Sequence, residues 1–206
     1  MYKSFFKPLF DFVGALLMLP FVILVVIVFA PIIYFTDRGP VFYNANRAGK
    51  NYKPFKMFKL RSMYVNSPDL KNPDGSTFNS DHDPRVTPIG RFLRKTSLDE
   101  FPQFLNVLVG DLSFVGPRPK LYCPEKYPNG LAGDMKASFK VKPGITGYAQ
   151  AYFRNSITQQ EKFYWDAYYA EHISLWLDVK IMLMTVWSVV ARKNINYGEG
   201  KRNGLK

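Results

Sequence analysis

The chain has 206 residues, enough for one domain with a hydrophobic core but too few for two domains of usual size plus a membrane segment. Its formal net charge of +12 indicates anionic partners: lipid headgroups, phosphorylated substrates or nucleic acid. A single cysteine, Cys123, excludes an intramolecular disulfide framework and a multi-cysteine metal site, and the usual glycine-rich dinucleotide and P-loop motifs are absent.

A long apolar segment lies near the start of the chain. Residues 12–36 carry no charge and as one helix would extend about 37 Å, more than the roughly 30 Å hydrocarbon core of a bilayer. Pro20 removes a helical hydrogen bond and predicts a bend. Lys3 and Lys7 precede the segment, and residues 38–64 that follow it are basic without an acid. A re-entrant helix that returns to the same face places both basic flanks in the cytoplasm, whereas a kinked single span is the equally weighted alternative.

The next two segments differ in polarity. Residues 41–64 alternate apolar and basic positions unevenly, which predicts short strands or extended segments at the membrane surface, or a solvated basic face. Residues 66–84 carry several proline and glycine turn signals, so we expect a loop that could act as a lid. The sequence Asp81-His82-Asp83 within it imitates a metal-binding motif, but the following Pro84 favours a turn.

Two adjacent carboxylates, Asp99 and Glu100, lie between a basic segment and an apolar helical stripe. The apolar residues that follow have the helical spacing i, i+3, i+4 and i+7: Phe101, Phe104, Leu105 and Leu108. This spacing predicts a helix that ends at Gly110. Ser97 and Glu100 could instead form a capping box, which Pro102 disfavours. In either case we expect both acids at a helix N-terminus, where free amides favour ionised carboxylates and can hold phosphate. An ionised carboxylate can act as a nucleophile.

The second half of the chain supplies a constrained arginine. Arg118 lies between Pro117 and Pro119, which predicts a guanidinium preorganised for phosphate or, with equal weight, a solvated arginine on a rigid turn. Residues 142–148 predict a tight turn, which Arg154 follows after a few residues.

Two helices are predicted towards the C-terminus. Thr158 and Glu161 have the spacing of a capping box that begins a helix extending to Tyr169. Residues 174–192 are apolar, with Trp176 and Trp187 on one helical face. We interpret this segment as a core helix, with an interfacial membrane helix as the alternative.

Together these segments resemble the monotopic phosphoglycosyl transferases, the bacterial sugar transferase family. The resemblance covers nearly the whole chain, and the order and number of the motifs carry it. The matching stretches are residues 39–42, 46–49, 55–63, 83–87, 90–119 and 142–147.

The resemblance implies transfer of a sugar phosphate from a UDP-sugar to polyprenyl phosphate, with release of UMP. It also implies an α+β fold: a small, mostly helical catalytic domain with short strands at the membrane surface, and an N-terminal re-entrant helix broken near a proline. We therefore expect a re-entrant helix over residues 1–37, a catalytic domain over 38–192 and a basic tail over 193–206, at the cytoplasmic face of the bacterial inner membrane and in contact with its phospholipids.

Residue by residue, the resemblance implies that Asp99 is the nucleophile that forms a covalent phosphosugar intermediate, and that Glu100 completes the acidic pair. It implies a Mg²⁺ cofactor with Asp99 as its protein ligand. Candidate substrate contacts are Lys59, Arg61, Arg91, Arg118 and Arg154.

Two positions depart from the pattern of many relatives. Leu19 stands where they have serine before the proline, and Tyr152 and Phe153 stand where they have Asn-Gly. The first departure leaves open how the bend is stabilised, and the second how the donor is recognised. The competing interpretation of the chain is a noncatalytic basic scaffold on an anionic membrane. A nucleic-acid module is disfavoured by the apolar segment and by the absence of a recognisable binding motif.

Overall fold

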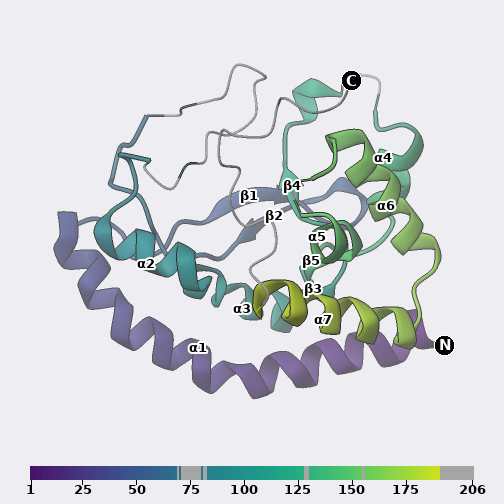
Figure 1. Cartoon of the computed structure of the whole chain (residues 1–206), viewed down its shortest axis with the longest axis horizontal. Helices are drawn as coiled ribbons and strands as arrows, with labels where there is room; N and C mark the ends of the chain where they lie inside the picture. The colour runs from purple at the N-terminus through teal and green to yellow at the C-terminus, as the bar shows by residue number, and fades with distance from the viewer. Residues whose placement is uncertain (69, 71–79, 81–82, 128–129, 155, 191–206) are drawn as a thin grey trace. The chain divides into compact units, whose positions relative to one another are not determined.

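The computed structural model describes residues 1–68, 70, 80, 83–127, 130–154 and 156–190. The described chain is mostly helical with short strands, so the predicted α+β class is confirmed (Figure 1). It forms two compact units that interleave in sequence. We call them the Asp99 unit, Ala15–Ala45 with Lys56–Asn106, and the Arg118 unit, Met1–Gly14 with Asn46–Phe55 and Val107–Lys206.

The first helix, α1 (Lys7–Asp37), continues a π-helical turn at Tyr2–Phe6. Figure 1 shows it as one unbroken ribbon, so Pro20 and Pro31 lie inside a continuous helix and neither ends it. Among the described residues, Tyr2–Asp37 is the one helix long and apolar enough to cross a membrane, and only 11% of its most apolar window is buried. The helix begins in the Arg118 unit and ends in the Asp99 unit.

The Asp99 unit is organised around α2 (Pro88–Thr96). Thr87 caps this helix by accepting a hydrogen bond from the Gly90 amide at 2.9 Å. Leu93 of α2 is fully buried against Ile33 of α1 and Leu60, which form the core of the unit. A Cβ at Gly90 would lie 1.9 Å from the Ser62 carbonyl oxygen, so glycine is required where α2 crosses the extended chain. This packing places the end of α2 beside residues 59–62.

The predicted short strands over residues 41–64 are confirmed. They are β1 (Ala45–Ala48) and β2 (Pro54–Met57), which form a three-stranded sheet of order β2-β1-β4 with β4 (Lys120–Leu121). β1 and β4 are antiparallel, and Ala48 pairs with Lys120. Outside the sheet, Phe42 forms an antiparallel bridge with Leu60.

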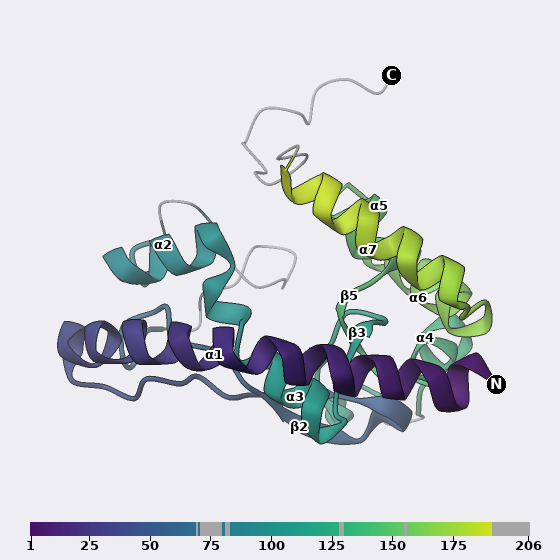
Figure 2. The same cartoon turned by 90° about the horizontal axis from the view of Figure 1, so that it is seen from below.

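The Arg118 unit contains a second, parallel sheet of β3 (Ser113–Val115) and β5 (Gly144–Thr146). Figures 1 and 2 show α7 (Leu175–Val190) beside this sheet and α5 (Tyr148–Tyr152), whereas α4 (Gly133–Ser138) packs on α6 (Gln159–Glu171). Val115, Tyr169 and Ile181 form its core.

Three sequence predictions about helices are confirmed. Thr158 and Glu161 form the expected capping box of α6, α7 lies where the apolar helix was predicted, and α3 (Gln103–Val109) ends before Gly110, whose φ is +88°. The tail predicted over residues 193–206 lies outside the described residues, as do Asp81 and His82.

Candidate active site

Asp99 and Glu100 lie in a 3₁₀ turn, Leu98–Glu100, between α2 and α3. The alternative capping box does not form, because Ser97 is the C-cap of α2 with a left-handed φ of 57° and its side chain caps nothing. Both acids lie in the first turn of this 3₁₀ helix, which agrees with the predicted helix N-terminus, whereas α3 begins only at Gln103, after Pro102. The position of the two acids is therefore set by the chain reversal at Ser97 and not by the free amides of α3.

Asp99 is buried, with only 2% of its surface exposed, and Lys59 is its charged partner. The Lys59 ammonium lies 2.8 Å from Asp99 Oδ2 and 3.1 Å from Glu100 Oε1, so one cation bridges both acids. The backbone supports this arrangement, because the Leu60 amide donates to the Asp99 carbonyl oxygen at 2.9 Å. Asp99 Oδ2 receives no aligned hydrogen bond from the described residues, so its contact with Lys59 is an ion pair.

Asn106 holds the segment that carries Lys59. This fully buried side chain accepts a hydrogen bond from the Phe58 amide and donates one to the Lys56 carbonyl oxygen, both at 2.8 Å. A buried side chain that satisfies two backbone groups fixes the position of that backbone. The sequence analysis did not single out Asn106. Its position inside the apolar stripe of α3 was the one feature of the sequence that could have indicated a buried polar side chain.

Burial raises the pKa of the Asp99 carboxyl above its ordinary value of 3.8, while the charge of Lys59 opposes that rise. This corrects the expectation that free helix amides dominate the electrostatics of this carboxylate. The nearby Glu100 also raises the pKa, and Arg94 lowers it. Ionised Asp99 therefore depends on two neighbouring cations.

Arg94 is a site residue that the sequence analysis missed. It lies on the last turn of α2 and is half-buried, and its Nε donates to Ser62 Oγ at 2.9 Å. Its charge acts on Asp99 and on Asp83. The sequence could have indicated Arg94 by its position one turn before Ser97. However, a serine does not predict the left-handed turn that brings Asp99 back towards α2.

The described part of the Asp81-His82-Asp83 motif is structural. Asp83 is fully buried, and Arg85 Nη2 donates to its Oδ2 at 2.7 Å, which holds the pKa of this carboxyl below its ordinary range. The turn predicted here is confirmed at Asp83, whose carbonyl oxygen accepts from the Val86 amide.

The remaining predicted contacts in the Asp99 unit differ in accessibility. Arg61 is buried, and it donates to the Asp37 carboxylate at the end of α1 and to three backbone carbonyl oxygens. Its donors are therefore used within the chain. Arg91 lies exposed on α2, one turn before Arg94. The structure thus brings Lys59, Asp99 and Glu100 together and gives Arg61 a different set of partners.

Arg118 and Arg154 belong to the Arg118 unit. Arg118 is exposed between Pro117 and Pro119, as the sequence predicted for a constrained arginine. Arg154 has a positive φ of 50°, and its Nη2 donates to Ser188 Oγ at 3.4 Å. Tyr152 and Phe153, the two departures from the pattern of relatives, pack with Tyr148 and Trp165 in one aromatic cluster.

A magnesium ion fits the acidic pair only in one coordination mode. Within the described residues, no group of three or more His, Cys, Asp or Glu side chains gathers at one point. Mg²⁺ commonly takes one or two carboxylates and completes its shell with water and substrate phosphate. Asp99, whose buried Oδ2 is ion-paired with Lys59, and the adjacent Glu100 supply the two carboxylates of that mode.

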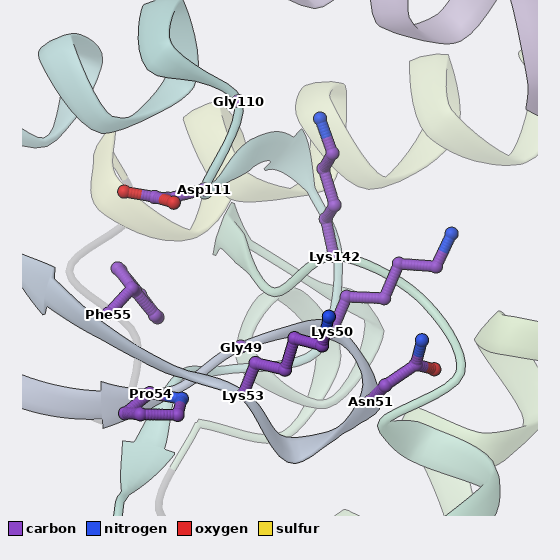
Figure 3. Close-up of a pocket in the computed structure, with 9 residues that line it drawn as sticks. All are labelled: Gly49, Lys50, Asn51, Lys53, Pro54, Phe55, Gly110, Asp111 and Lys142. Atoms are coloured by element: carbon purple, nitrogen blue, oxygen red, sulfur yellow. The ribbon is translucent and has the colours of Figure 1, made fainter.

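A pocket of about 340 Å³ lies on the Arg118 unit and is basic. It is lined by Gly49, Lys50, Asn51, Lys53, Pro54, Phe55, Gly110, Asp111 and Lys142. Figure 3 shows that the ammonium groups of its three lysines point in different directions and that Asp111 points away from them. The lysines therefore do not converge on one ligand position.

Comparison with known proteins identifies the family. Residues 2–192 match the bacterial sugar transferase family. The chain belongs to this family. The match includes α1, the acidic pair and Arg118, so one family pattern covers both compact units.

Curated relatives of this bacterial sugar transferase share nearly two fifths of its residues. A UDP-galactose-lipid carrier transferase of Erwinia amylovora is 38% identical over 92% of the chain and 41% of its own length. A UDP-glucose:undecaprenyl-phosphate glucose-1-phosphate transferase of Klebsiella pneumoniae has the same identity and coverage. The uncharacterized sugar transferase EpsL of Bacillus subtilis is 38% identical over 92% of the chain and 89% of its own length. The chain thus spans about two fifths of the first two relatives and most of the third.

Proposed function

We propose that this bacterial sugar transferase moves a sugar 1-phosphate from a UDP-sugar to undecaprenyl phosphate and releases UMP, an initiating step of bacterial polysaccharide assembly. The family and the names of the relatives from Erwinia and Klebsiella support the substrate class. The observation that carries the chemistry is the buried Asp99 carboxylate, which is ion-paired with the Lys59 ammonium that also contacts Glu100.

The reaction proceeds by two displacements at phosphorus. An Asp99 carboxylate oxygen attacks the β-phosphorus of the donor, the bond to the bridging oxygen breaks, and UMP leaves with that oxygen. A phosphate oxygen of undecaprenyl phosphate then attacks the aspartyl phosphosugar, which restores the carboxylate and forms the lipid diphosphosugar. Each step exchanges one phosphorus–oxygen bond for another, so one site serves a soluble donor and a lipid acceptor in turn and gives ping-pong kinetics.

The neighbouring side chains have separate roles in this proposal. Lys59 offsets the repulsion between the Asp99 carboxylate and the donor diphosphate, and Glu100 orients Lys59 through its 3.1 Å hydrogen bond. Arg94 adds a second positive charge near Asp99, and exposed Arg91 is available to the donor. Arg61 is left out of the phosphate contacts because its donors are already used. Magnesium, when bound by Asp99 with Glu100, would neutralise diphosphate charge and improve UMP as a leaving group.

The test is replacement of the nucleophile. Asp99→Asn should abolish UMP release from a panel of UDP-sugars while the protein stays folded, and radiolabelled donor without lipid should label wild type at Asp99. Asp134→Asn, which removes an exposed acid on α4, is the matched control and should keep full activity. Substantial turnover by Asp99→Asn would exclude Asp99 as nucleophile. If wild type turns over no donor, the noncatalytic scaffold is the better description.

We also propose that α1 is re-entrant, because both of its ends are bonded to the rest of the chain. At its start, Tyr2 Oη and Lys7 Nζ donate to the buried Asp178 carboxylate, each at 2.7 Å. At its end, Asp37 accepts from Arg61 and from the Val65 amide.

These contacts bear on topology because the polar chain that follows α1 has no second candidate span among its described residues. We therefore place both ends of α1 on one side of the membrane in this proposal, and the basic flanks of the helix assign that side to the cytoplasm by the positive-inside rule. The proposal keeps the division of the chain into residues 1–37, 38–192 and 193–206.

The topology is tested by cysteine labelling in a Cys123→Ser background. The exposed residues Ser4 and Tyr43 flank α1, so Ser4→Cys and Tyr43→Cys should react with an impermeant maleimide from the same side of sealed vesicles. Labelling from opposite sides would establish a single span.

A bilayer also accounts for the exposed apolar face of α7. Ile181 and Asp178 are buried, but Trp176, Leu183 and Trp187 on the opposite face are 57–76% exposed. This exposure favours the interfacial alternative over a pure core helix, because a water-facing stripe of this kind is unusual and tryptophan prefers the membrane interface.

A further inference from the structure

One buried acid in the Arg118 unit, Asp166, has one cation within ion-pair distance and two others whose charges act on it, and we call these four residues the Asp166 cluster. Asp166 of α6 is 1% exposed, and its Oδ2 has no hydrogen-bond partner among the described residues. The Lys120 ammonium of β4 lies 3.6 Å from that oxygen. The charges of Lys162 and Arg118 also act on the Asp166 carboxyl. The cluster therefore holds three positive charges and one negative charge.

Lys120 is held from two sides. Its Nζ faces the Asp166 carboxylate, and it also lies 5.0 Å from the centre of the Phe163 ring. An ammonium has three N–H donors, and Asp166 and the ring use no more than two of them. The side chain stays 20% exposed, so a third donor can reach a ligand.

Arg118 is presented by a rigid segment beside Lys120. The Gly144 amide donates to the Pro117 carbonyl oxygen at 2.9 Å, and the Gly116 amide donates to the Thr146 carbonyl oxygen at 2.8 Å. A Cβ at Gly116 would lie 2.5 Å from the Lys142 carbonyl oxygen, so the approach of this segment to β5 requires glycine. Preorganised cations lose little freedom when they bind an anion.

The charges of the cluster are unbalanced. Burial and the nearby Arg118 and Lys162 lower the pKa of Lys120, while Asp166 opposes that effect. Among the described residues, neither Arg118 nor Lys162 makes an ion pair or a side-chain hydrogen bond. The net charge of +2 equals that of a phosphate monoester dianion with opposite sign.

We propose that Arg118, Lys120 and Lys162 form a binding site for a phosphate dianion, and that Asp166 is the positioning residue that holds Lys120 in it. The site deepens the proposed function and rests on it for the identity of the ligand, which is the phosphate of UMP or that of the lipid acceptor. Of its residues, only Arg118 was predicted from the sequence to contact substrate.

Direct binding to the full-length protein in detergent tests the site without turnover. UMP and farnesyl phosphate are titrated separately by calorimetry at pH 8, where both phosphates are dianions. Lys120→Met and Lys162→Met should each lower the affinity for one of the two ligands roughly tenfold, which is the loss expected for one charge-assisted contact. Lys180→Met removes an exposed lysine of α7 and is the matched control, with unchanged affinity. The ligand that weakens identifies the source of the phosphate.

Asp166→Asn separates positioning from simple electrostatics. Removing an acid from a basic site should tighten anion binding if only the net charge matters, whereas loss of the Lys120 position should weaken it. The double variant Asp166→Asn/Lys120→Met should bind no worse than Lys120→Met alone, because Asp166 acts through Lys120. Thermal melts check folding, and if Asp166→Asn does not fold, the two lysine variants decide the case.

Unchanged affinity of Lys120→Met and Lys162→Met for both ligands would overturn the site, and tighter binding by Asp166→Asn would overturn the positioning role. Neither result depends on Asp99. If Asp99→Asn kept its turnover while the lysine variants lost affinity, the phosphate site would stand and the assignment of the nucleophile would fall.

Discussion

Replacement of Arg61 separates a structural arginine from a substrate contact. Its guanidinium makes five hydrogen bonds, two to the Asp37 carboxylate and three to carbonyl oxygens, including that of Ile33 at 3.2 Å. Both side chains are largely buried, with 8% and 16% of their surfaces exposed. Asp37→Asn therefore leaves a buried charge without its counter-ion, which costs about 3–5 kcal/mol.

A loss of that size is measurable as a shift in melting temperature. For a chain of this length it corresponds to roughly 6–20 °C, and Arg61→Met should show a comparable loss. The double variant should lose less stability than the sum of the two single variants, because each single substitution leaves the other residue of the pair without its partner. Thermal unfolding in one detergent measures all three, and Arg91→Met, an exposed arginine on α2, is the control.

The kinetic result completes this test. Folded Arg61→Met protein, assayed well below its melting temperature, should keep a KM for the donor near that of wild type. Stability within about 2 °C of wild type together with a large rise in KM would refute the structural role and return Arg61 to the substrate contacts.

Three further predictions concern the acidic site, the α2 crossing and the cluster around Asp166. Because Asp99 must be ionised to attack and Lys59 lowers its pKa, Lys59→Met should move the acidic limb of the kcat/KM profile to higher pH; a limb that stays in place or moves lower would contradict the ion pair. Gly90→Ala should lower stability by roughly 1–3 kcal/mol or more in thermal melts, since its Cβ would lie 1.9 Å from the Ser62 carbonyl oxygen, and a melt like that of wild type would show that the crossing can relax. Burial raises the pKa of Asp166 from 3.8 to about 6, so the stability from this group is complete below about pH 4 and is lost as pH rises through 6. In wild type, this group should change the free energy of unfolding by on the order of 3 kcal/mol between about pH 4 and 7. Asp166→Asn should remove that change, as measured by thermal melts across this pH range.

Local patterns predicted the elements of this fold well. The capping residues of α6 and the glycine after α3 are read directly from the chain, because each acts through its own backbone neighbours. The apolar segment likewise predicted α1. Its prolines did not end the helix, since a proline removes one hydrogen bond from a long ladder.

The candidate site was predicted in part. Asp99, Glu100 and Lys59 were identified through a family resemblance, and the structure brings them together. Arg94, Asn106 and Asp166 were missed because each acts on a segment distant in sequence or across a turn. Asp166 lies among aromatic residues of α6, and nothing in the sequence indicates a role for it. Only the packing shows that it is buried beside Lys120.

The sequence by itself determined the order of the elements and the basic character, because these depend on composition, periodicity and neighbouring residues, and its resemblance to the bacterial sugar transferases indicated the family and singled out the acidic pair. Only the tertiary structure decided which cation serves which acid: Lys59 pairs with Asp99, Arg61 with Asp37, and Lys120 with Asp166. The physical reason is that ion pairing and desolvation depend on distances and burial, which chain order does not fix.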